Sequence, residues 1–197
     1  MKVLYITFAA VLTDVITKLL VKGIQLPFEG IRLSGMPYGS SIPLLGDFLK
    51  LTFVENPGMA FGIRVSNKEY LALFTIIATL GLLFYLYKIR KESFWLRMPM
   101  SLILAGAIGN LTNRVFFGAL FGYAPLLQGN VVDFIDVDFF DLQIFGYYLN
   151  RWPIFNLADV FVTVGVVLLL AFGKLTAAKD SDEMITQNTN VVKDSNE

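Results

Sequence analysis

The sequence predicts an α-helical polytopic membrane protein with four transmembrane helices. Of its 197 residues, 55% are hydrophobic and only 16% are charged, whereas a typical soluble domain has about 25% charged residues. The apolar residues gather into four runs, near residues 3–21, 69–87, 98–117 and 152–173. Each run approaches the roughly 20 residues that a helix needs to cross a bilayer. Apolar side chains occur all around each run, as expected for helices that face lipid on one side and protein on the other.

Two other interpretations of these runs fit the sequence less well. Buried helices of a soluble core would need amphipathic segments to cover them, and little such material remains. A cleaved signal peptide could explain only the first run. That run contains Asp14 and Lys18 within its apolar stretch and lacks a clean small-x-small cleavage site, so we expect it to be a mature helix.

Charges between the runs predict the orientation. The short loop of residues 88–97 holds four basic residues against one acid, and short basic loops stay in the cytoplasm. Lys2 and Lys174 flank the first and last runs, which places both termini on that same side. Residues 118–150 contain no Lys or Arg but several Asp. Both long loops, residues 22–68 and 118–151, are therefore expected to face outward.

The first outer loop is too long and too rich in aromatic residues to be a disordered connector, so we expect it to fold at the membrane surface. Leu49 to Val54 reads as a strand, and Asn56-Pro57-Gly58 reads as a turn. Residues 1–176 form one membrane domain. Residues 177–197 are polar without periodicity, which predicts a disordered cytoplasmic tail.

Composition excludes several kinds of chemistry. The chain has no His and no Cys, which excludes His-ligated zinc hydrolases, Cys nucleophiles and Ser-His triads. A net charge of zero gives no general attraction to nucleic acid. Asp136, Asp138 and Asp141 lack the glycine and spacing of a calcium loop, so we interpret them as a solvated acidic face. No metal or cofactor is expected.

Charged groups inside a bilayer cost about 3 kcal/mol each near a helix centre, so each needs a reason. Asp14 and Lys18 lie four residues apart on one helical face and can pair. The pair could fix packing or could help to bind a substrate. Asn110 and Arg114 have the same spacing near the outer end of the third run. Arg114 offers a fork of donors to a carboxylate or a peptide carbonyl, or it could extend to the outer surface.

Two further acids are expected at the outer mouth of the bundle. Asn156 and Asp159 share a face at the start of the fourth run, and Asp133 lies in the apolar segment GNVVDFID before it. If Asp133 and Asp159 meet in a poorly solvated site, they cannot both ionise cheaply, and one keeps a proton. Such a pair contains a general acid and a general base without metal or covalent intermediate. Two acids there could instead bind an ion or relay protons.

The residues also resemble a known family. D-x-x-x-K at residues 14–18, NPGMAF at 56–61, GAIGNLTNR at 106–114, VVDF at 131–134 and FNLAD at 155–159 resemble, in order, the motifs of bacterial lipoprotein signal peptidase (signal peptidase II). These motifs lie in the first, third and fourth predicted spans and in both outer loops. Five matches in the right order are far more specific than any single one.

The resemblance implies an intramembrane aspartyl endopeptidase of the bacterial cytoplasmic membrane. Such an enzyme removes the signal peptide of a prolipoprotein just before a diacylglyceryl-modified Cys. Asp133 and Asp159 correspond to the catalytic pair. The resemblance also implies an outer β-cradle, a small surface helix, inhibition by globomycin, contact with membrane lipid and a monomeric enzyme. The positions expected to bind substrate or to orient the carboxylates are Asn56, Gly58, Asn110, Arg114 and Asn156.

The sequence departs from the family pattern in two places. The family usually has Asp just before the motif arginine, whereas this chain has Asn113, so that position is given no catalytic role. The stretch of residues 136–151 is longer than in compact members and could form an extra surface element.

Two rival functions remain at this stage. A proton-coupled transporter would spread its acids through the membrane depth, whereas Asp133 and Asp159 gather toward one face. A noncatalytic scaffold would tolerate amides at both positions.

Overall fold

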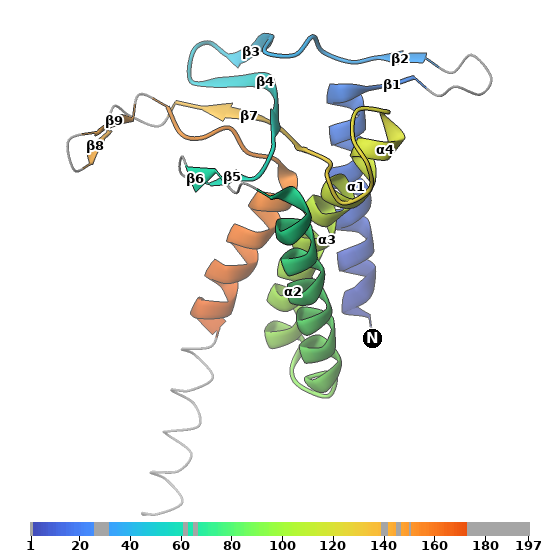
Figure 1. Cartoon of the computed structure of the whole chain (residues 1–197). Helices are drawn as coiled ribbons and strands as arrows, with labels where there is room; N and C mark the ends of the chain where they lie inside the picture. Colours follow the sequence, from blue (N-terminus) through green and yellow to red (C-terminus); the bar gives the residue numbers. More distant parts are fainter. Residues whose placement is uncertain are drawn as a thin grey trace, which may run out of the picture.

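The computed structural model describes residues 2–25, 32–60, 63–64, 67–138, 142–144, 147–149 and 151–172. Its helices stand side by side beneath a layer of short strands (Figure 1). The helices are α1 (Val3–Lys22), α2 (Lys68–Lys88), α3 (Phe94–Thr112), a π-helical segment (Asn113–Phe117), α4 (Gly118–Leu120) and a C-terminal helix (Leu157–Phe172). The strands are β1 (Gly23–Gln25), β2 (Arg32–Ser34), β3 (Ser41–Leu45), β4 (Leu49–Asn56), β5 (Met59–Ala60), β6 (Ile63–Arg64), β7 (Val131–Val137), β8 (Leu142–Ile144) and β9 (Tyr147–Leu149).

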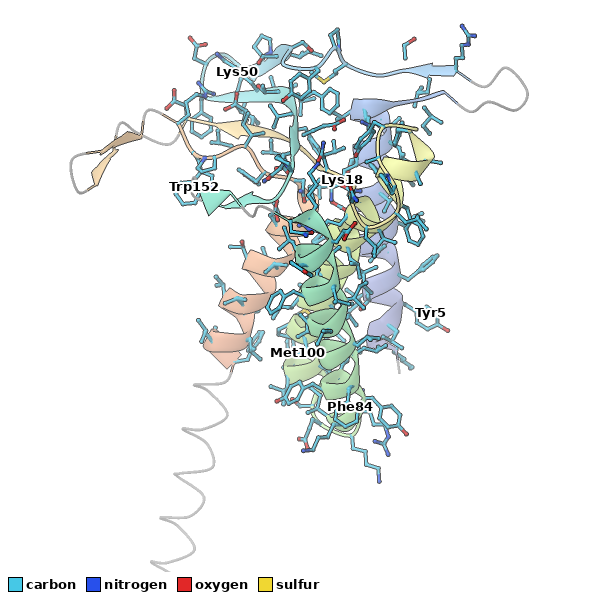
Figure 2. The ribbon with its side chains drawn as sticks, in the orientation of Figure 1. Tyr5, Lys18, Lys50, Phe84, Met100 and Trp152 are labelled. Carbon is cyan, nitrogen blue, oxygen red and sulfur yellow. The ribbon has the colours of Figure 1, made fainter. Side chains whose placement is uncertain are left out.

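Three helices among the described residues are long and apolar enough to cross a membrane, namely Val3–Lys22, Lys68–Lys88 and Phe94–Leu120. They correspond to the first three predicted spans. The third span is longer than predicted because the helix begins at Phe94, so Arg97 belongs to it and not to the connecting loop. Large apolar side chains on the outer surface, such as Tyr5, Phe74 and Phe84, point away from the bundle, as Figure 2 shows for Tyr5 and Phe84.

The fourth predicted span, residues 152–173, is only partly helical in the described residues. The C-terminal helix begins at Leu157 and is shorter than the other three. The preceding residues are extended because they pair with β7: Trp152 N–H donates to the carbonyl of Val137, and Phe155 forms an antiparallel bridge with Ile135. A helix from Trp152 was therefore the wrong prediction, and the count of four spans stays a prediction. Residues 173–197, including the predicted tail at 177–197, lie outside the described residues.

Small residues in α3, Gly106 and Gly109, let the helices approach closely. A Cβ atom on Gly109 would lie 2.4 Å from Oδ2 of Asp14 in α1. A Cβ atom on Gly106 would lie 2.3 Å from the carbonyl oxygen of Ala158 in the C-terminal helix. Helix α3 therefore contacts both neighbours through its glycines, and this contact brings their polar residues together.

The outer layer contains a three-stranded antiparallel sheet in the order β3-β4-β7. Strand β4 confirms the predicted strand and extends it to Asn56. In the β4–β7 ladder, Asn56 pairs with Val131 and Val54 pairs with Asp133. Three two-stranded sheets, β1-β2, β5-β6 and β8-β9, complete the described part of this layer. The predicted surface helix has no counterpart in the described residues of the first outer loop (23–25, 32–60, 63–64 and 67) and stays a prediction.

Alternation along β7 gives the strand two different faces. Val132 and Phe134 enter a buried apolar cluster with Val21, Phe53 and Phe117. Val131 and Asp133 point the other way and line a cavity. Packing of the apolar face therefore fixes the direction in which Asp133 projects.

The start of α1, the connection between α2 and α3, and the end of the C-terminal helix all lie at one end of the bundle, opposite the strands (Figure 1). A four-residue apolar cluster, Val3, Leu86, Met100 and Leu104, packs near this end. The two ends of the molecule therefore differ: one is an apolar helix bundle and the other carries the sheets and the polar residues.

Candidate active site

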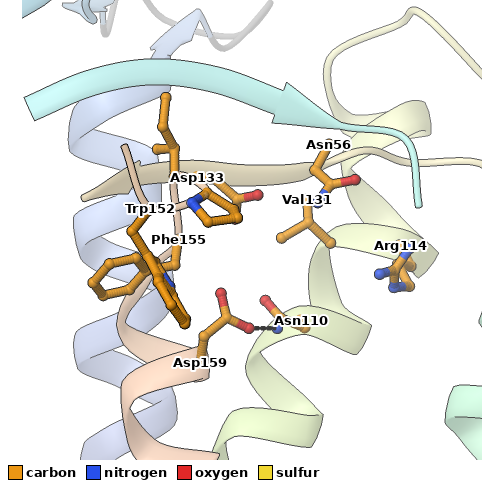
Figure 3. Close-up of a pocket in the computed structure, with 10 residues that line it drawn as sticks. Asn56, Asn110, Arg114, Val131, Asp133, Trp152, Phe155 and Asp159 are labelled. Carbon is orange, nitrogen blue, oxygen red and sulfur yellow. Dashed lines mark hydrogen bonds between the residues drawn. The ribbon is translucent and has the colours of Figure 1, made fainter. Parts of the chain in front are cut away.

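A cavity of about 290 Å³ lies between the sheet and the outer ends of the helices (Figure 3). Strands β4 and β7 form one side, and α3 and the start of the C-terminal helix form another. Five of the residues predicted from sequence line it. The lining consists of Asn56, Asn110, Arg114, Val131, Asp133, Trp152, Pro153, Ile154, Phe155 and Asp159.

Asp133 is buried, with 4% of its surface exposed. Nδ2 of Asn156 donates to its Oδ1 at 2.6 Å, and the Asn56 side chain also hydrogen-bonds to this carboxyl group. Burial raises the pKa of Asp133 to about 6; the Asn156 hydrogen bond lowers it, the nearby Asp159 charge raises it, and the Asn56 bond lowers it. Burial dominates because the charged form loses its hydration. Asp133 therefore holds a proton more readily than an ordinary aspartic acid.

Asp159 occupies the first turn of the C-terminal helix, where Asn156 is the N-cap. The backbone N–H of Asp159 donates to Oδ1 of Asn156 at 3.2 Å, and the backbone N–H of Asn156 donates to Oδ2 of Asp159 at 3.1 Å. This reciprocal pattern is a capping box, which the spacing Asn-x-x-Asp produces locally. Nδ2 of Asn110 donates to Oδ1 of Asp159 at 2.9 Å (Figure 3). Helix capping and α3 together fix the Asp159 carboxylate.

Asn156 connects the two acids. Its Nδ2 contacts Asp133 and also Oδ1 of Asn110, at 3.1 Å, while its backbone N–H contacts Asp159. The two carboxylates thus share one amide residue and one cavity, although they lie on a strand and a helix 26 positions apart.

Asp14 and Lys18 form the predicted pair, with both side chains fully buried and 2.8 Å between Nζ and Oδ2. Nζ of Lys18 also donates to Oδ1 of Asn110 at 2.8 Å. Oδ1 of Asp14 accepts the N–H of Ala158 in the first turn of the C-terminal helix at 2.9 Å. The pair does not line the cavity. It joins α1 to α3 and to the C-terminal helix, and it touches the site through Asn110.

Arg114 lies in the π-helical segment, a helix form that is frequent at functional sites. Its guanidinium lines the cavity and forms no hydrogen bond or ion pair with any residue that the structure describes.

Nearby, the N–H of Gly58 donates to Oδ1 of Asn56 at 2.9 Å. Gly58 has φ of 112°, and a Cβ atom there would lie 2.6 Å from Leu71 Cδ2. Only glycine suits this position.

Some residues have roles that the sequence did not indicate. Asn113 is fully buried, and its Oδ1 accepts the N–H of Val132 at 3.1 Å, so it holds the strand next to Asp133. Its Nδ2 has no hydrogen-bond partner among the described residues. In the sequence, the only indication of a role for Asn113 was its position directly before the motif arginine. Trp152 also lines the cavity.

The predicted solvated acidic face is wrong for Asp136. This residue is buried, and its carboxylate accepts from Arg151 Nε at 2.8 Å and from Thr52 Oγ1 at 2.7 Å. Arg151 also pairs with the half-buried Asp138. Asp141 lies outside the described residues. Among the described residues, no group of three or more acidic side chains could hold a metal ion.

Comparisons with known proteins agree on one family. The model of the family "Signal peptidase (SPase) II" matches residues 6–173. Lipoprotein signal peptidase from Chlorobaculum tepidum is 35% identical over 167 residues, covering 85% of this chain and 90% of the relative. The enzyme of the same name from Streptococcus pneumoniae is 32% identical, covering 77% and 86%.

Solved structures agree with the sequence relatives. A bacterial membrane enzyme determined by the in meso method at 2.3 Å resolution superposes with a TM-score of 0.65 and 31% identity. The superposition covers 90% of this chain and 91% of that one. A second in meso structure, at 1.9 Å, gives a TM-score of 0.61 and 32% identity.

Helices suited to a bilayer, together with this family match, define a membrane-embedded protease. The chain belongs to the lipoprotein signal peptidase (signal peptidase II) family, whose members cleave signal peptides from prolipoproteins.

Proposed function

We propose that the chain cleaves prolipoproteins by an aspartyl mechanism in which Asp133 and Asp159 act as the catalytic pair. The observation that carries this proposal is the position of Asn156, which hydrogen-bonds to both carboxylates at one cavity. Both acids also lie on the motifs that resemble the family's catalytic motifs. The proposed cleavage site is the peptide bond just before the diacylglyceryl-modified Cys.

In this mechanism Asp159 is the base and Asp133 is the acid. Asp159 lies in the first turn of the C-terminal helix and accepts amide hydrogen bonds on both oxygens, which orient its carboxyl group at the cavity. Asp133 has a pKa raised to about 6 by burial, which favours the protonated form.

The reaction adds water across the peptide bond. Asp159 takes a proton from a water molecule as the oxygen attacks the scissile carbonyl carbon, while Asp133 donates a hydrogen bond to the carbonyl oxygen. The C–N bond then breaks, and the leaving nitrogen takes a proton from the pair. The products are a signal peptide with a new carboxyl end and a lipoprotein whose amino end is the modified Cys.

Arg114 and Asn56 are the proposed substrate-binding groups. The guanidinium of Arg114 lines the cavity and has donors available for a backbone carbonyl of the extended substrate. Gly58 lies next to Arg114: a Cβ atom at Gly58 would be in ordinary contact with Nη1, at 3.6 Å. Asn110 orients Asp159 and so acts on the carboxylate itself.

The lipid on the substrate supplies much of the proposed affinity. Each buried CH₂ group contributes about 0.8 kcal/mol, so diacylglyceryl chains that remain in the bilayer hold the cysteine at membrane depth. The scissile bond then reaches the cavity at the level where the helices meet the sheet. An unlipidated precursor is therefore expected to be a poor substrate.

The proposed setting is the bacterial cytoplasmic membrane, with both chain ends in the cytoplasm and the active site near the outer face. The placement of α1's start at the end opposite the sheets supports this orientation (Figure 1). We also propose that the enzyme works as a monomer without a cofactor and that globomycin inhibits it.

The test replaces each acid by its amide. Purified Asp133→Asn and Asp159→Asn variants are incubated with a lipidated precursor, and products are measured by mass spectrometry. Each variant is expected to lose at least 1,000-fold in kcat, because acid and base are both needed. Asp138→Asn, just beyond the end of β7, is the matched control and should retain activity. Full processing by either folded active-site variant would refute the catalytic pair and would favour a scaffold.

A further inference from the structure

A second polar cluster lies at the outer end of α1 and does not line the cavity. It consists of Lys22, Glu55, Asn130 and Lys68, which we call the outer clamp. Lys22 forms an ion pair with Oε1 of Glu55. Nδ2 of Asn130 donates to Oε2 of Glu55 at 3.0 Å, and Nζ of Lys68 donates to Oδ1 of Asn130 at 2.7 Å. The outer clamp therefore joins α1, β4, the segment before β7 and the start of α2.

The Lys22–Glu55 pair is largely shielded from solvent. The two side chains are 11% and 17% exposed. The ammonium group of Lys22 lies 4.5 Å from the ring centre of Phe121 and 5.0 Å from that of Tyr123. Contact with aromatic faces stabilises a cation, and more so where water is reduced. An ion pair in such surroundings has a defined geometry, unlike a pair of mobile surface side chains.

Apolar packing alone does not fix these side chains. A cavity of about 400 Å³ adjoins Lys22 and Glu55 and is also lined by the rings of Phe53, Phe121 and Tyr123. On the side that borders this space, Lys22 and Glu55 are not enclosed by apolar neighbours. The polar contacts of the outer clamp must therefore hold the ends of the connected elements in place.

Two members of the outer clamp directly precede, in sequence, residues that line the candidate active site. Glu55 precedes Asn56, and Asn130 precedes Val131. Asn56 and Val131 are register partners at the end of the β4–β7 ladder, and both line the candidate active site. Neighbouring strand residues project to opposite faces. Glu55 therefore binds the outer clamp on one face of β4, while Asn56 projects from the other face toward Asp133.

We infer that the outer clamp is a positioning device that keeps Asn56 against Asp133, and that Glu55 is its central residue. Glu55 does not touch the reacting atoms; it acts through the position of Asn56. The inference rests on the proposed catalytic role of Asp133.

Charged and polar groups from every adjoining element face Asp133, and the experiment leaves them unchanged. They are Asn156 and Asp159 of the C-terminal helix, Lys18 of α1, Arg114 of the π-helical segment and Asn56 of β4. If Asn56 moves away, Asp133 loses a hydrogen bond that lowers its pKa. The alkaline side of the pH–rate profile should then move to higher pH.

The test compares Glu55→Ala, Glu55→Gln and the control Asp47→Asn. Asp47 also pairs with a lysine on the same sheet, but its side chain is 91% exposed. Glu55→Ala is expected to lower kcat about 10- to 100-fold with KM changed less than about threefold, because small displacements of a positioned group have effects of this size. Glu55→Gln can still accept from Asn130 and should lie between Glu55→Ala and wild type. Asp47→Asn should behave like wild type.

The pH–rate profile separates positioning from loss of folded protein. A decrease in kcat with an unchanged profile, or no decrease at all, would overturn the inference. If Glu55→Ala does not fold, Lys22→Met keeps the contact with the rings and removes the charge, and the same lowered kcat and shifted profile are expected for it. Asp133→Asn is assayed in parallel. Activity in that variant would refute the proposed function, whereas an inactive Asp133→Asn beside a normal Glu55→Ala would refute only the role of the outer clamp.

Discussion

Asn156 donates a 2.6 Å hydrogen bond from its side-chain amide to Oδ1 of Asp133, and this contact links the cap of the C-terminal helix to β7 at the candidate active site. The same residue caps its own helix through Asp159. One short side chain thus has a folding role and a positioning role. Comparing a substitution of Asn156 with a substitution of another helix cap separates the folding role from the positioning role.

Asn156→Ala is expected to lower kcat by about 100-fold or more, because one carboxylate loses its amide donor and the other loses the cap that holds it. Asn67 is the matched control. It caps α2 by accepting the N–H of Glu69 at 3.0 Å and lies outside the cavity. Both substitutions should cost about 1 kcal/mol of stability. Equal kcat values for the two variants, measured on the lipidated precursor, would contradict the proposed role of Asn156.

The pH dependence of kcat/KM follows from the state of Asp133. Burial raises its pKa to about 6, and the proposed mechanism needs its protonated form. Activity should therefore be present below this value and fall as pH rises through it, by about tenfold per pH unit on the alkaline side. Initial rates between about pH 5 and pH 8 test this. A flat profile over that range would show that protonation of Asp133 does not limit cleavage.

Lys18→Met is expected to destabilise the protein by roughly 3–5 kcal/mol, because it leaves the fully buried Asp14 carboxylate without its counter-ion. The double variant Asp14→Asn/Lys18→Met removes both charges and should recover most of this stability. Thermal unfolding in detergent measures both effects. If the single and double variants are equally unstable, the pair is not the source of the destabilisation.

The double variant also tests the link to catalysis. Lys18 donates to Asn110, which donates to Asp159. Without Lys18, Oδ1 of Asn110 loses one of its two donors and keeps only Nδ2 of Asn156. The Asn110 amide is then held less firmly, so kcat should remain below the wild-type value even where stability returns. Wild-type kcat in a stable double variant would assign the pair to packing alone.

Gly109→Ala is expected to destabilise the helix bundle by about 1–3 kcal/mol, since the new methyl group would meet the Asp14 carboxylate at 2.4 Å. Gly81 in α2 provides the control, because no atom lies within 4 Å of a Cβ atom there. Gly81→Ala should leave stability unchanged or raise it slightly. The measurement is the difference in Tm between each variant and wild type. A Gly109→Ala variant as stable as Gly81→Ala would contradict the close contact between α1 and α3.

Arg114→Lys should raise KM about tenfold or more while the fold is kept, because the ammonium group retains charge but loses the planar fork of donors. Arg90, at the opposite end of the bundle, allows the same exchange as a control. Its guanidinium stacks on Tyr87 at 4.3 Å and has no contact with the cavity. Unchanged kinetics in both variants would remove Arg114 from the proposed substrate contacts.

Local patterns predicted those features that depend on neighbouring residues. Apolar runs identified three spans to within a few residues, and the Asn-x-x-Asp spacing placed Asn156 and Asp159 on one face. These features could be predicted because each needs only the helical repeat and the sizes of adjacent side chains.

Features that depend on distant partners could not be predicted. Residues 152–155 are extended because Phe155 bridges to Ile135, and helical periodicity contains no information about that pairing. Asp136 is buried because Arg151 and Thr52 supply its donors. Asn113 and Glu55 likewise act through residues from other elements. Their roles become visible only when the sheet is placed on the helices.

The π-helical segment Asn113–Phe117 separates the third span into two parts with different tasks. Inward of it, glycines face the neighbouring helices; within it, Arg114 faces the cavity. A π-helical turn contains about one residue more than a regular α-helical turn. Gaining or losing one residue here would therefore rotate Arg114 about the helix axis and leave the glycine contacts of α3 unchanged. If Arg114 binds substrate as proposed, a one-residue length change within Asn113–Phe117 is therefore expected to alter substrate binding while the membrane-embedded helix contacts are kept.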